Sequence, residues 1–523
     1  MEKHGSESYF VIGEGLLTES DDGRDAAGPQ IAALEAAPPF RFSRMGPKGV
    51  NRQLGEGSHK KVANEMAAGG GGAGQIPAGF TYLGQFIDHD LTFDKTSVML
   101  GANISPAALL QGRSPSLDLD SLYGAGPEDP ESAKFYEADG IRLKMGKAQA
   151  AGGFPAMDGH DLPRGAGSSA AEKRKAVIPD KRNDENLAVA QTHLAMMRFH
   201  NRVADSLPAS VPASQHFAQA RELVTKHYQW MIRTDYLPRI CAATVVNNVF
   251  NSGRKAFEVG VSATDIPTMP IEFSVAAFRL GHSMVRQAYD WNKAFDDGDG
   301  TLDWLFFFSA TGGNLAGNPT LASNWVADFR RLYEFKGNLA VSEGKFNRAM
   351  RIDTTLVDPL KNLPPETFGG GAGIPFDDPR RNLAFRNLRR AKMVKLATGQ
   401  QMATFLKGKG VNLTKLTKAQ IRDGNNGADL SLLTQSQLDA FLKDTPLWFY
   451  ILREAELNGG KLKGVGARIV AETFHRAIEG SQASIVRDPT FKPKFGPNNT
   501  TFSMVDLMLF AFKGKKALLA PLG

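Results

Sequence analysis

The sequence predicts a mostly α-helical protein with long connections and very little β structure. Apolar residues recur three and four positions apart over 186–207 and again over 217–240, which is typical of helices packed on one face. Long alternating patterns typical of strands are scarce. Stretches rich in Gly or Pro at 69–74, 148–167 and 368–373 interrupt the helical segments without changing the composition on either side. We therefore expect one body of many helices, although 523 residues would allow three or four domains at about 150 residues each.

The remaining helical segments share the same spacing of apolar residues. They are expected near 270–288, 325–332, 382–395, 433–442 and 465–478. The first 45 residues are polar, contain Ala, Pro and Gly, and show little periodicity. We therefore predict an irregular arm over 1–45, followed by a single domain over 46–523.

The composition excludes several classes of protein. With 42% hydrophobic and 22% charged residues, the chain is too apolar to be fully disordered. Its net charge of +7 is mild for this length, and no run of five like charges occurs, so nucleic acid is not an expected partner. A single cysteine excludes disulfide scaffolds, Cys-rich zinc sites and iron–sulfur clusters within one chain. Cys241 follows apolar residues, which favours a buried, inert thiol over a nucleophile.

No stretch of the sequence is apolar over the roughly 18 residues that a membrane-spanning helix needs. The first residues, MEKHGSES, also lack the apolar core of a signal peptide. The sequence therefore predicts a soluble protein without membrane insertion, which is either cytoplasmic or exported by a non-Sec route.

A first group of chemically active side chains lies in the segment YLGQFIDHDLTFD, residues 82–94. On a helix, Gln85, Asp88 and His89 share one face at spacings of three and four. The apolar neighbours of these residues would keep them dry, and polar groups in a dry segment are costly unless they are used or satisfied. A lone histidine there would more often be a satisfied core residue. Several functional groups within six residues favour a functional site instead.

Two acidic segments carry oxygen atoms suited to a hard cation. In SPSLDLDSLYG, residues 114–124, oxygen-bearing side chains alternate along the chain, as a Ca²⁺ loop would need, although an Asx turn explains the pattern equally well. The segment is not an EF-hand. The segment DDGDG, residues 296–300, also resembles a cation loop, but a solvated turn is the better interpretation.

Two further segments combine charged residues or histidine with helical patterns. DKRNDE, residues 180–185, opens the helix expected over 186–207, where acidic residues suit the helix dipole and Arg182 and Glu185 could form a surface ion pair. AFRLGHS, residues 277–283, places His282 after a glycine, which would let a flat cofactor approach closely. A satisfied core histidine is the alternative for His282.

The segments 82–94, 114–124, 180–185 and 277–283 resemble, in that order, the distal histidine motif, the calcium loop, the distal arginine segment and the proximal histidine segment of animal-type haem peroxidases. These enzymes belong to the peroxidase–cyclooxygenase superfamily, and this chain is most similar to its bacterial members. NLAFRNLRR, residues 382–390, and TPLWFY, residues 445–450, resemble two further segments of the family. The resemblance covers roughly residues 40 to 520, and the distal motif is the most specific part.

The resemblance implies a haem b site built on two histidines. His282 would be the axial ligand of the iron, and Asn387 would accept its Nδ1 hydrogen, which makes the ligand more basic. His89 would be the distal base, with Arg182 beside it. Gln85 would lie in the distal pocket, where the family binds water or halide.

The family also implies residues that hold the edges of the haem and a calcium ion. Arg279 and Arg390 would pair with the haem propionates. Asp88 and Glu185 match the positions that form haem esters in some members. The implied Ca²⁺ ligands are Asp90, Ser114, Ser116 through its carbonyl, Asp118 and Asp120.

The implied function is reduction of H₂O₂ by the haem through an oxoferryl intermediate, with oxidation of a small organic donor or a halide. Two departures from the family pattern limit this expectation. Asn186 stands where some mammalian members carry a methionine linked to haem, so strong halide oxidation is not expected. Asp120 replaces a hydroxyl residue in the calcium loop. No motif specifies the donor or the oligomeric state.

Three other functions fit the sequence less well. A fatty-acid dioxygenase or cyclooxygenase needs a tyrosine three residues before the proximal histidine, and Arg279 occupies that position. A non-catalytic haem-binding or adhesion module would not need both His89 and Arg182. A metallohydrolase is disfavoured because the sequence has no His-Glu-x-x-His or comparable cluster.

Overall fold

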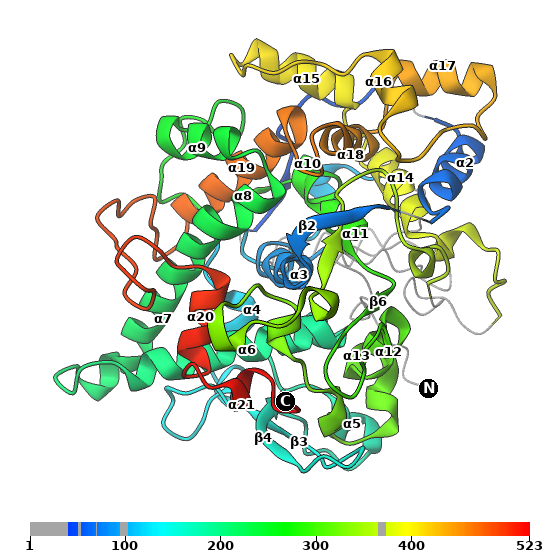
Figure 1. The fold of residues 1–523 in the computed structure, drawn as a ribbon. Coiled ribbons are helices and arrows are strands. Elements are labelled where there is room, and N and C mark those ends of the chain that lie inside the picture. Colours follow the sequence, from blue (N-terminus) through cyan, green and yellow to red (C-terminus); the bar gives the residue numbers. More distant parts are fainter. Residues whose placement is uncertain (1–39, 51–53, 70, 95–102, 364–372) are drawn as a thin grey trace.

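The computed structural model describes residues 40–50, 54–69, 71–94, 103–363 and 373–523. These residues form a mostly α-helical body in which the strands make four two-stranded sheets (Figure 1), which confirms the predicted fold class. Most of the predicted arm, residues 1–39, and most of the Gly-rich stretch at 368–373 lie outside the described residues.

The helices of the N-terminal half include the buried helix α3. They are α2 (Glu56–Met66), α3 (Gly79–Leu91), α4 (Asp120–Tyr123), α5 (Ala170–Arg174), α6 (Leu187–Asp205), α7 (Ala213–Met231), α8 (Leu237–Ile240) and α9 (Ala243–Ser252). The helices of the C-terminal half are α10 (Ile271–Ser274), α11 (Gly281–Met284), α12 (Leu302–Phe307), α13 (Ala310–Gly313), α14 (Leu383–Met393), α15 (Gly399–Gly408), α16 (Lys418–Asp423), α17 (Gln435–Lys443), α18 (Leu447–Leu457), α19 (Gly464–Glu479), α20 (Met504–Ala511) and α21 (Lys516–Leu519).

The strands are short and pair across long sequence separations. They are β1 (Phe42–Ser43) with β5 (Met269–Pro270), β2 (Ala73–Pro77) with β8 (Arg348–Met350), β3 (Gly146–Ala148) with β4 (Met157–Asp161), and β6 (Ala288–Tyr289) with β7 (Gly300–Thr301). Only the β1–β5 pair is parallel. These pairs fasten loops to the helical body and do not form a layer of their own.

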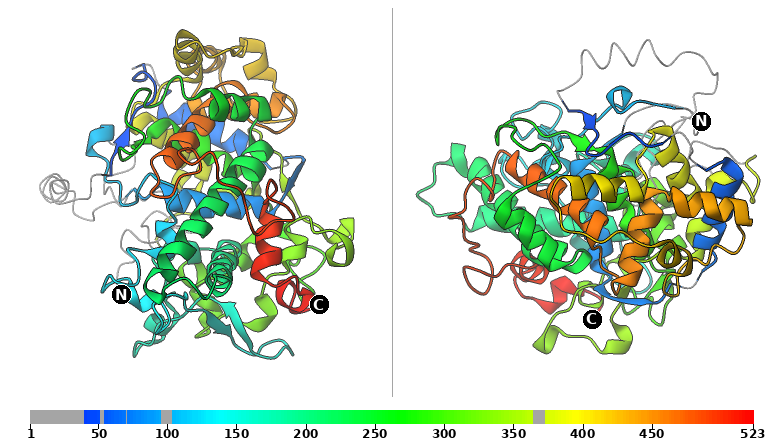
Figure 2. Two further views of the ribbon diagram at one scale, coloured as in Figure 1. Left: turned by 90° about the vertical axis from the view of Figure 1, so that its left-hand side faces the viewer. Right: turned by 90° about the horizontal axis from the view of Figure 1, so that it is seen from above.

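Helix α3 lies near the middle of the molecule, where Figure 1 shows it nearly end-on. It contacts α4, α6 and α11. Helices α15, α16 and α17 lie at one end of the molecule and the β3–β4 hairpin lies at the other, in both Figure 1 and the left view of Figure 2. Helix α20, the helix before the last one, packs along α6. The elements that contact α3 are spread between residues 73 and 350, from β2 to β8.

Every residue of α3 is buried, including four polar or charged ones in its second half. A helix buried on all sides pays a large desolvation cost for such groups unless each has a partner. Gly84 allows the close packing, because a Cβ there would lie 2.4 Å from the hydroxyl oxygen of Tyr236. The polar residues of α3 are therefore held in a dry and tightly packed environment.

The structure confirms four of the expected helices and corrects two others. The segments expected at 186–207, 382–395, 433–442 and 465–478 correspond to α6, α14, α17 and α19. The helix expected over 270–288 is wrong, because the chain breaks into α10, a 3₁₀ turn at Ala277–Leu280 and α11. The break falls at Ala276, whose φ of −135° is not helical. The segment 325–332 contains only short 3₁₀ turns.

The helix expected over 217–240 is present, but it is not one regular α-helix. Instead, α7 continues through a π-helical turn at Ile232–Tyr236 into α8, which has Pro238 in its first turn. Proline has no amide hydrogen and its ring clashes with the carbonyl four residues before it. The wider π turn accommodates both effects, and it places Tyr236 against Gly84 of α3.

Two glycine-bearing segments that we expected to be loops contain strands. Gly74 lies in β2, where a Cβ would be 2.7 Å from the carbonyl oxygen of Ala349 in β8, so only glycine fits. The stretch at 148–167 contains most of the β3–β4 hairpin. The end of the predicted arm also joins the body, because Phe42 and Met45 are buried.

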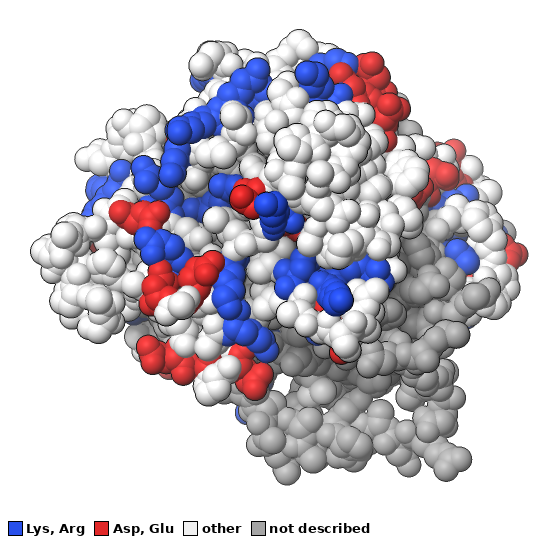
Figure 3. Space-filling view, turned by 90° about the horizontal axis from the view of Figure 1, so that it is seen from below, with Lys and Arg blue, Asp and Glu red and all other residues white. Residues whose placement is uncertain are grey.

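The surface and the helix lengths agree with the composition. On the face shown in Figure 3, Lys and Arg lie among Asp and Glu, and the two charges are not sorted into separate areas. None of the described helices combines the length and the apolar character needed to cross a membrane.

Candidate functional site

His89 lies near the end of α3 and is almost completely buried. Its Nδ1 lies 2.8 Å from Oδ1 of Asn183, and its Nε2 lies 3.6 Å from Oε1 of Glu185. Because an amide oxygen only accepts hydrogen bonds, Asn183 fixes the proton of the neutral imidazole on Nδ1. Burial, with the nearby charge of Arg182, lowers the pKa of His89 to about 3. The lone pair on Nε2 is thus available to accept a proton at neutral pH.

Arg182 is held from three directions beside His89. Its Nε and Nη2 donate to the two carboxylate oxygens of Asp180 at 2.9 and 2.7 Å. Nη2 also donates to the carbonyl oxygen of His89 at 2.9 Å. The guanidinium lies 4.4 Å from the ring centroid of Phe93, a distance suited to a cation–π contact. Arg182 is 3% exposed, so the alternative of a surface ion pair with Glu185 is wrong.

Gln85 and Glu185 complete a hydrogen-bonded group on the same side of α3. The amide nitrogen of Gln85 donates to Glu185, and its amide oxygen accepts from Asn186 at 2.8 Å. Asn186 is also the N-cap of α6, where its side chain accepts from the backbone of Val189. The start of α6 is thereby tied to α3.

Asp88 is buried on α3 and accepts a hydrogen bond from the hydroxyl of Thr92 at 3.2 Å. Burial raises its pKa to about 6, although the charges of Arg279, Arg182 and Arg390 oppose that increase. The carboxyl is therefore within electrostatic reach of all three arginines that the sequence analysis assigned to the haem.

His282 lies in α11, and its Nδ1 is 2.8 Å from Nδ2 of Asn387 in α14. The contact was expected, but its polarity differs from the expectation. Arg279 donates from Nη1 to Oδ1 of Asn387 at 3.1 Å, so the amide oxygen is taken and the amide nitrogen faces the imidazole. The edge of Trp448 in α18 contacts the imidazole of His282, with ring centroids 6.3 Å apart.

Arg279 and Arg390 line one cleft together with Ser274. Arg390 forms an ion pair of 2.5 Å with Asp94, just beyond the end of α3. The hydroxyl of Ser274 is buried and makes no hydrogen bond with the residues that the structure describes. Two guanidinium groups and an unsatisfied hydroxyl suit a ligand that brings carboxylates to this cleft. With the two histidines on α3 and α11, the donor set fits a haem with its two propionates.

The loop at 114–124 contacts Asp90, the residue after His89. Asp90 is fully buried and accepts hydrogen bonds from the backbone of Leu119 at 3.2 Å and of Ser121 at 3.4 Å. Leu119 has a φ of 59°, a left-handed conformation that costs energy for a leucine. The hydroxyl of Ser114 accepts from the backbone of Ser116 at 3.3 Å.

Asp118 and Asp120 bring two further carboxyl groups to the loop. Burial, with the charge of Asp120, raises the pKa of Asp118 to about 7. Burial and the same neighbour raise the pKa of Asp90 well above its usual value. A bound cation would offset the repulsion among these carboxyl groups and favour their ionised forms. Arg221 supplies part of that charge, because it lies 3.3 Å from Asp120.

The segment at 296–300 forms an ion-paired turn. Asp296 pairs with Arg331 and Lys345, and Asp297 also pairs with Lys345. Within the described residues, Asp290, Asp296 and Asp297 form the one group of three acidic or histidine side chains whose oxygens lie within 4.8 Å. Arg331 and Lys345 already pair with two of these three carboxylates, which agrees with the interpretation as a turn. Cys241 is buried as predicted, and burial raises the pKa of its thiol.

Sequence reasoning missed the residues that orient the distal pair. Asn183 bridges two histidines, because its Nδ2 lies 3.0 Å from Nδ1 of His193. Asp180 holds Arg182, and Arg113 in turn contacts Asp180 at 2.5 Å. The sequence analysis interpreted the acidic residues of segment 180–185 as favourable for the helix dipole, so it did not predict the contacts of Asp180 and Asn183. No sequence motif around Arg113 indicated its contact with Asp180.

Comparisons with known proteins agree with this geometry. The model of the animal haem peroxidase family matches residues 99–307, a range that includes the loop at 114–124, Arg182 and His282 and begins after α3. Heme peroxidase 2 of Caenorhabditis elegans is 25% identical over 186 residues, or 35% of this chain and 25% of that protein. Rat (Rattus norvegicus) thyroid peroxidase is 27% identical over 191 residues, or 35% of this chain and 20% of that protein. The chain thus spans a quarter or less of the length of these relatives.

Two solved structures share the fold over nearly the whole chain. Peroxidase A from Dictyostelium discoideum superposes with a TM-score of 0.58 and 15% identity, covering 92% of this chain and 94% of that one. The fatty acid α-dioxygenase of Oryza sativa gives a TM-score of 0.57 and 10% identity, covering 97% and 88%. At such identities the likeness shows the fold alone. The family model, the peroxidase relatives and these structures thus agree that this chain is similar to animal haem peroxidases.

Proposed function

We propose that this chain is a haem-dependent peroxidase that reduces H₂O₂ and oxidises small organic donors. The observation that carries the proposal is the orientation of His89. Its Nδ1 proton is fixed by Asn183, and its Nε2 is a neutral base inside a dry pocket. A binding module has no need for a histidine held in one tautomer beside a pinned arginine.

The proton transfer is assigned to Nε2 of His89. H₂O₂ is too weak an acid to ionise at pH 7, so a base must take its proton as the O–O bond breaks and return it to the oxygen that leaves as water. A pKa of about 3 keeps His89 unprotonated at neutral pH, which the first half of this transfer requires. The hydrogen bond to Asn183 stabilises the imidazolium formed at the midpoint.

Arg182 is assigned to the charge that develops on the separating oxygen. Its guanidinium is already held by Asp180 and by the carbonyl of His89, so little reorganisation is needed during the reaction. Gln85 would hold a water or a halide in the same pocket, and Glu185 would orient Gln85 through their hydrogen bond.

A bound haem would supply the redox chemistry, since its iron would reduce peroxide and then accept electrons from the donors. His282 would hold it from the side of α11, with Arg279 and Arg390 on its propionates. Pairing of Arg279 with a propionate would release Oδ1 of Asn387. A half-turn of the amide, whose two ends have nearly the same shape, would then let Asn387 accept the Nδ1 hydrogen of His282. This exchange explains the polarity seen between these side chains.

A bound Ca²⁺ would relieve the repulsion among Asp90, Asp118 and Asp120 and fix the turn that carries His89. Ser114 and the carbonyl of Ser116 would complete its ligands, as the family implies. Asp88 and Glu185 are the candidates for ester bonds to the haem. The pKa of Asp88, raised by burial, leaves part of its carboxyl protonated near pH 6.

The proposal is tested with haem-loaded protein in a guaiacol oxidation assay and in the transient reaction with H₂O₂. Substituting His89→Ala should lower the second-order rate constant with peroxide by about 10²- to 10⁴-fold, the range typical of a lost general base. Asn201→Ala is the control, because Asn201 is likewise a buried polar residue, with two hydrogen bonds of 2.8 Å to the backbone of Leu143. If His89→Ala reacts as fast as the control, the distal assignment is wrong.

The fold likeness to fatty acid α-dioxygenases does not carry a second proposal. In the sequence analysis, the radical tyrosine of such enzymes was placed three residues before the proximal histidine. In this chain Arg279 occupies that position and donates to Asn387 and to the carbonyl of Ser274.

A further inference from the structure

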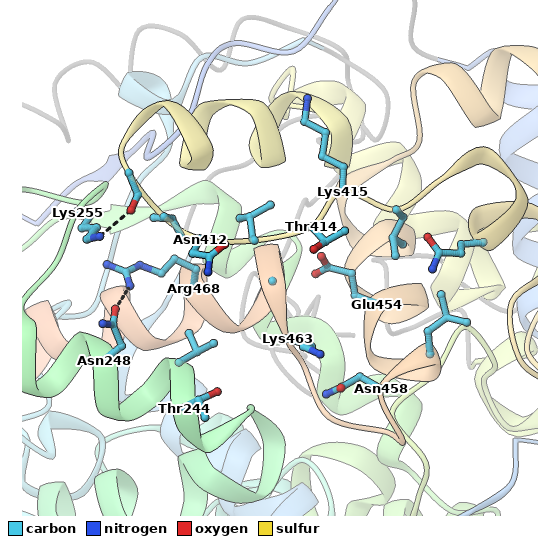
Figure 4. A pocket seen from close by; sticks show the side chains of 18 residues that line it. Thr244, Asn248, Lys255, Asn412, Thr414, Lys415, Glu454, Asn458, Lys463 and Arg468 are labelled. Carbon is cyan, nitrogen blue, oxygen red and sulfur yellow. Dashed lines mark hydrogen bonds between the residues drawn. The ribbon is translucent and has the colours of Figure 1, made fainter.

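A second cavity lies between α9, α18, α19 and the loop at 409–417, and we call it the α19 pocket. It encloses about 560 Å³, which falls in the range of pockets that hold small molecules. Figure 4 shows side chains from these four segments pointing toward a shared space. The pocket shares no lining residue with the cleft of Arg279 and Arg390. Helix α18 separates the two sites, since Trp448 at its start contacts His282 and Leu457 at its end lines the pocket.

The charges that line the α19 pocket are mostly positive. Lys255, Lys415, Lys463 and Arg468 line it, against a single carboxyl group, that of Glu454. Glu454 is turned toward the start of α19, where it accepts hydrogen bonds from the backbone of residues 465 and 466 at 3.2 Å each. It is thus already occupied as a helix cap. The three lysines are exposed, but two of them already interact elsewhere: Lys415 donates to the hydroxyl of Thr404 at 2.6 Å, and the charge of Lys463 acts on Glu454.

Arg468 is the buried cation of the pocket, with 2% of its surface exposed. Its Nε donates to Glu472 at 2.5 Å and its Nη1 donates to Asn248 at 2.7 Å. Nη2 is buried and makes no hydrogen bond with the residues that the structure describes. A buried guanidinium nitrogen without a partner is costly, and an anion is the group that satisfies it best.

Lys255 lies on the same side of the pocket as Arg468 (Figure 4). Its Nζ donates to the carbonyl oxygen of Gly410 at 2.6 Å, which holds the ammonium at the pocket. A negatively charged group on a ligand would therefore be favourable at this side of the pocket. Val245, Val411 and Leu413 line the same pocket and provide apolar surface. We propose that the α19 pocket binds a small organic anion, with its carboxylate between Lys255 and Arg468 and its apolar body on these three residues.

The test uses the full haem-loaded chain and 2-naphthoate as the probe, with binding measured by isothermal titration calorimetry. The uncharged 2-naphthalenemethanol has nearly the same shape and should bind about tenfold more weakly, because it lacks the charge-assisted contacts. Lys255→Met should weaken 2-naphthoate about fivefold, the effect of losing one exposed ion pair. Lys255 is exposed, so this substitution leaves the fold intact.

Lys336→Met is the matched control, because Lys336 is exposed and does not line the pocket. It should bind 2-naphthoate as the unaltered chain does. Arg468→Lys keeps the positive charge beside Glu472 but removes Nη2, and it should weaken binding more than Lys255→Met does. The proposal is overturned if both probes bind equally, if Lys255→Met and Lys336→Met behave alike, or if 2-naphthoate shifts the Soret band while its affinity is insensitive to Lys255→Met.

Discussion

Asn183 offers the sharpest test of the role proposed for His89. Its amide accepts from Nδ1 of His89 at 2.8 Å and donates to Nδ1 of His193 at 3.0 Å. His193 is itself buried on α6, with its Nε2 making no hydrogen bond among the described residues. Asn183→Ala removes the acceptor that keeps the His89 proton on Nδ1. The imidazole can then carry its proton on Nε2, where it no longer acts as a base.

The size of this effect follows from a single neutral hydrogen bond. Such a bond contributes about 1 to 1.5 kcal/mol net, and each 1.36 kcal/mol is a factor of ten in rate. Asn183→Ala should therefore lower the rate constant with H₂O₂ about tenfold, well short of the loss expected for His89→Ala. Asn183→Asp tests the same contact by strengthening the interaction with Nδ1 of His89 instead of removing it. A carboxylate beside Nδ1 stabilises the imidazolium and raises the pKa of His89 from about 3.

Stopped-flow absorbance in the Soret region measures this rate constant from acidic to neutral pH. Below its pKa, His89 is protonated and cannot accept a proton, so the rate falls as the pH falls through that value. For the unaltered chain the fall lies near pH 3, and for Asn183→Asp it moves to higher pH. Asn201→Ala controls for the loss of a buried amide on α6. The reasoning is refuted if Asn183→Ala matches this control and Asn183→Asp leaves the acid limb in place.

Three further outcomes follow from the site and its surroundings. His282→Ala should lose most of its Soret absorbance at equal protein concentration with an unchanged far-ultraviolet dichroism spectrum, and a retained band would exclude His282 as the ligand. Chelation of Ca²⁺ should lower the melting temperature and the haem content, and Asp118→Asn should lose this response while Asp158→Asn, at an exposed position, keeps it. Burial raises the pKa of Glu454 to about 7 from 4.5 in the unfolded chain. The folded chain then holds an extra proton between these values, so its stability falls as the pH rises through that window. Glu454→Gln should flatten this dependence in thermal melts.

Three of the four helices that the sequence predicted well begin with a side-chain cap, and α19 is the exception. Asn186 and Asn382 each accept backbone hydrogen bonds at the first turn, so α6 and α14 begin where the pattern does. The segment 270–288 misled because its apolar residues continue across the break, and no side-chain cap marks where α10 or α11 begins. Its break at Ala276 is imposed by tertiary packing, which brings the backbone of Ser274 and the side chain of Asn387 to Arg279.

The site residues also fall into two groups, those that could be named from the sequence and those that could not. His89, Arg182 and His282 could be named because their segments resemble those of a known family in order. The partner of each could not be derived from local spacing, since the contacts cross about a hundred residues. Asn183 lies 94 positions from His89, and Asn387 lies 105 from His282. A pattern of period 3.6 reports the face of one helix and contains no information about which other helix meets it.

His89 and His282 differ in which atom of the neighbouring asparagine faces the imidazole ring. At His89 the amide oxygen of Asn183 faces the ring, so the base is prepared by the protein alone. At His282 the amide nitrogen faces the ring, because Arg279 occupies the oxygen of Asn387. Metal ligation through Nε2 needs the opposite polarity. Engagement of Arg279 by a carboxylate would thus be coupled to the basicity of His282. Arg279→Leu removes the donor that occupies Oδ1 of Asn387, so it should weaken propionate binding while leaving the amide free to accept from Nδ1 of His282. Asn387→Leu removes the acceptor itself and should make His282 a weaker ligand. Resonance Raman spectroscopy of the ferrous haem-loaded protein should therefore show a lower iron–histidine stretching frequency for Asn387→Leu and no decrease for Arg279→Leu, and a decrease in both would contradict the exchange.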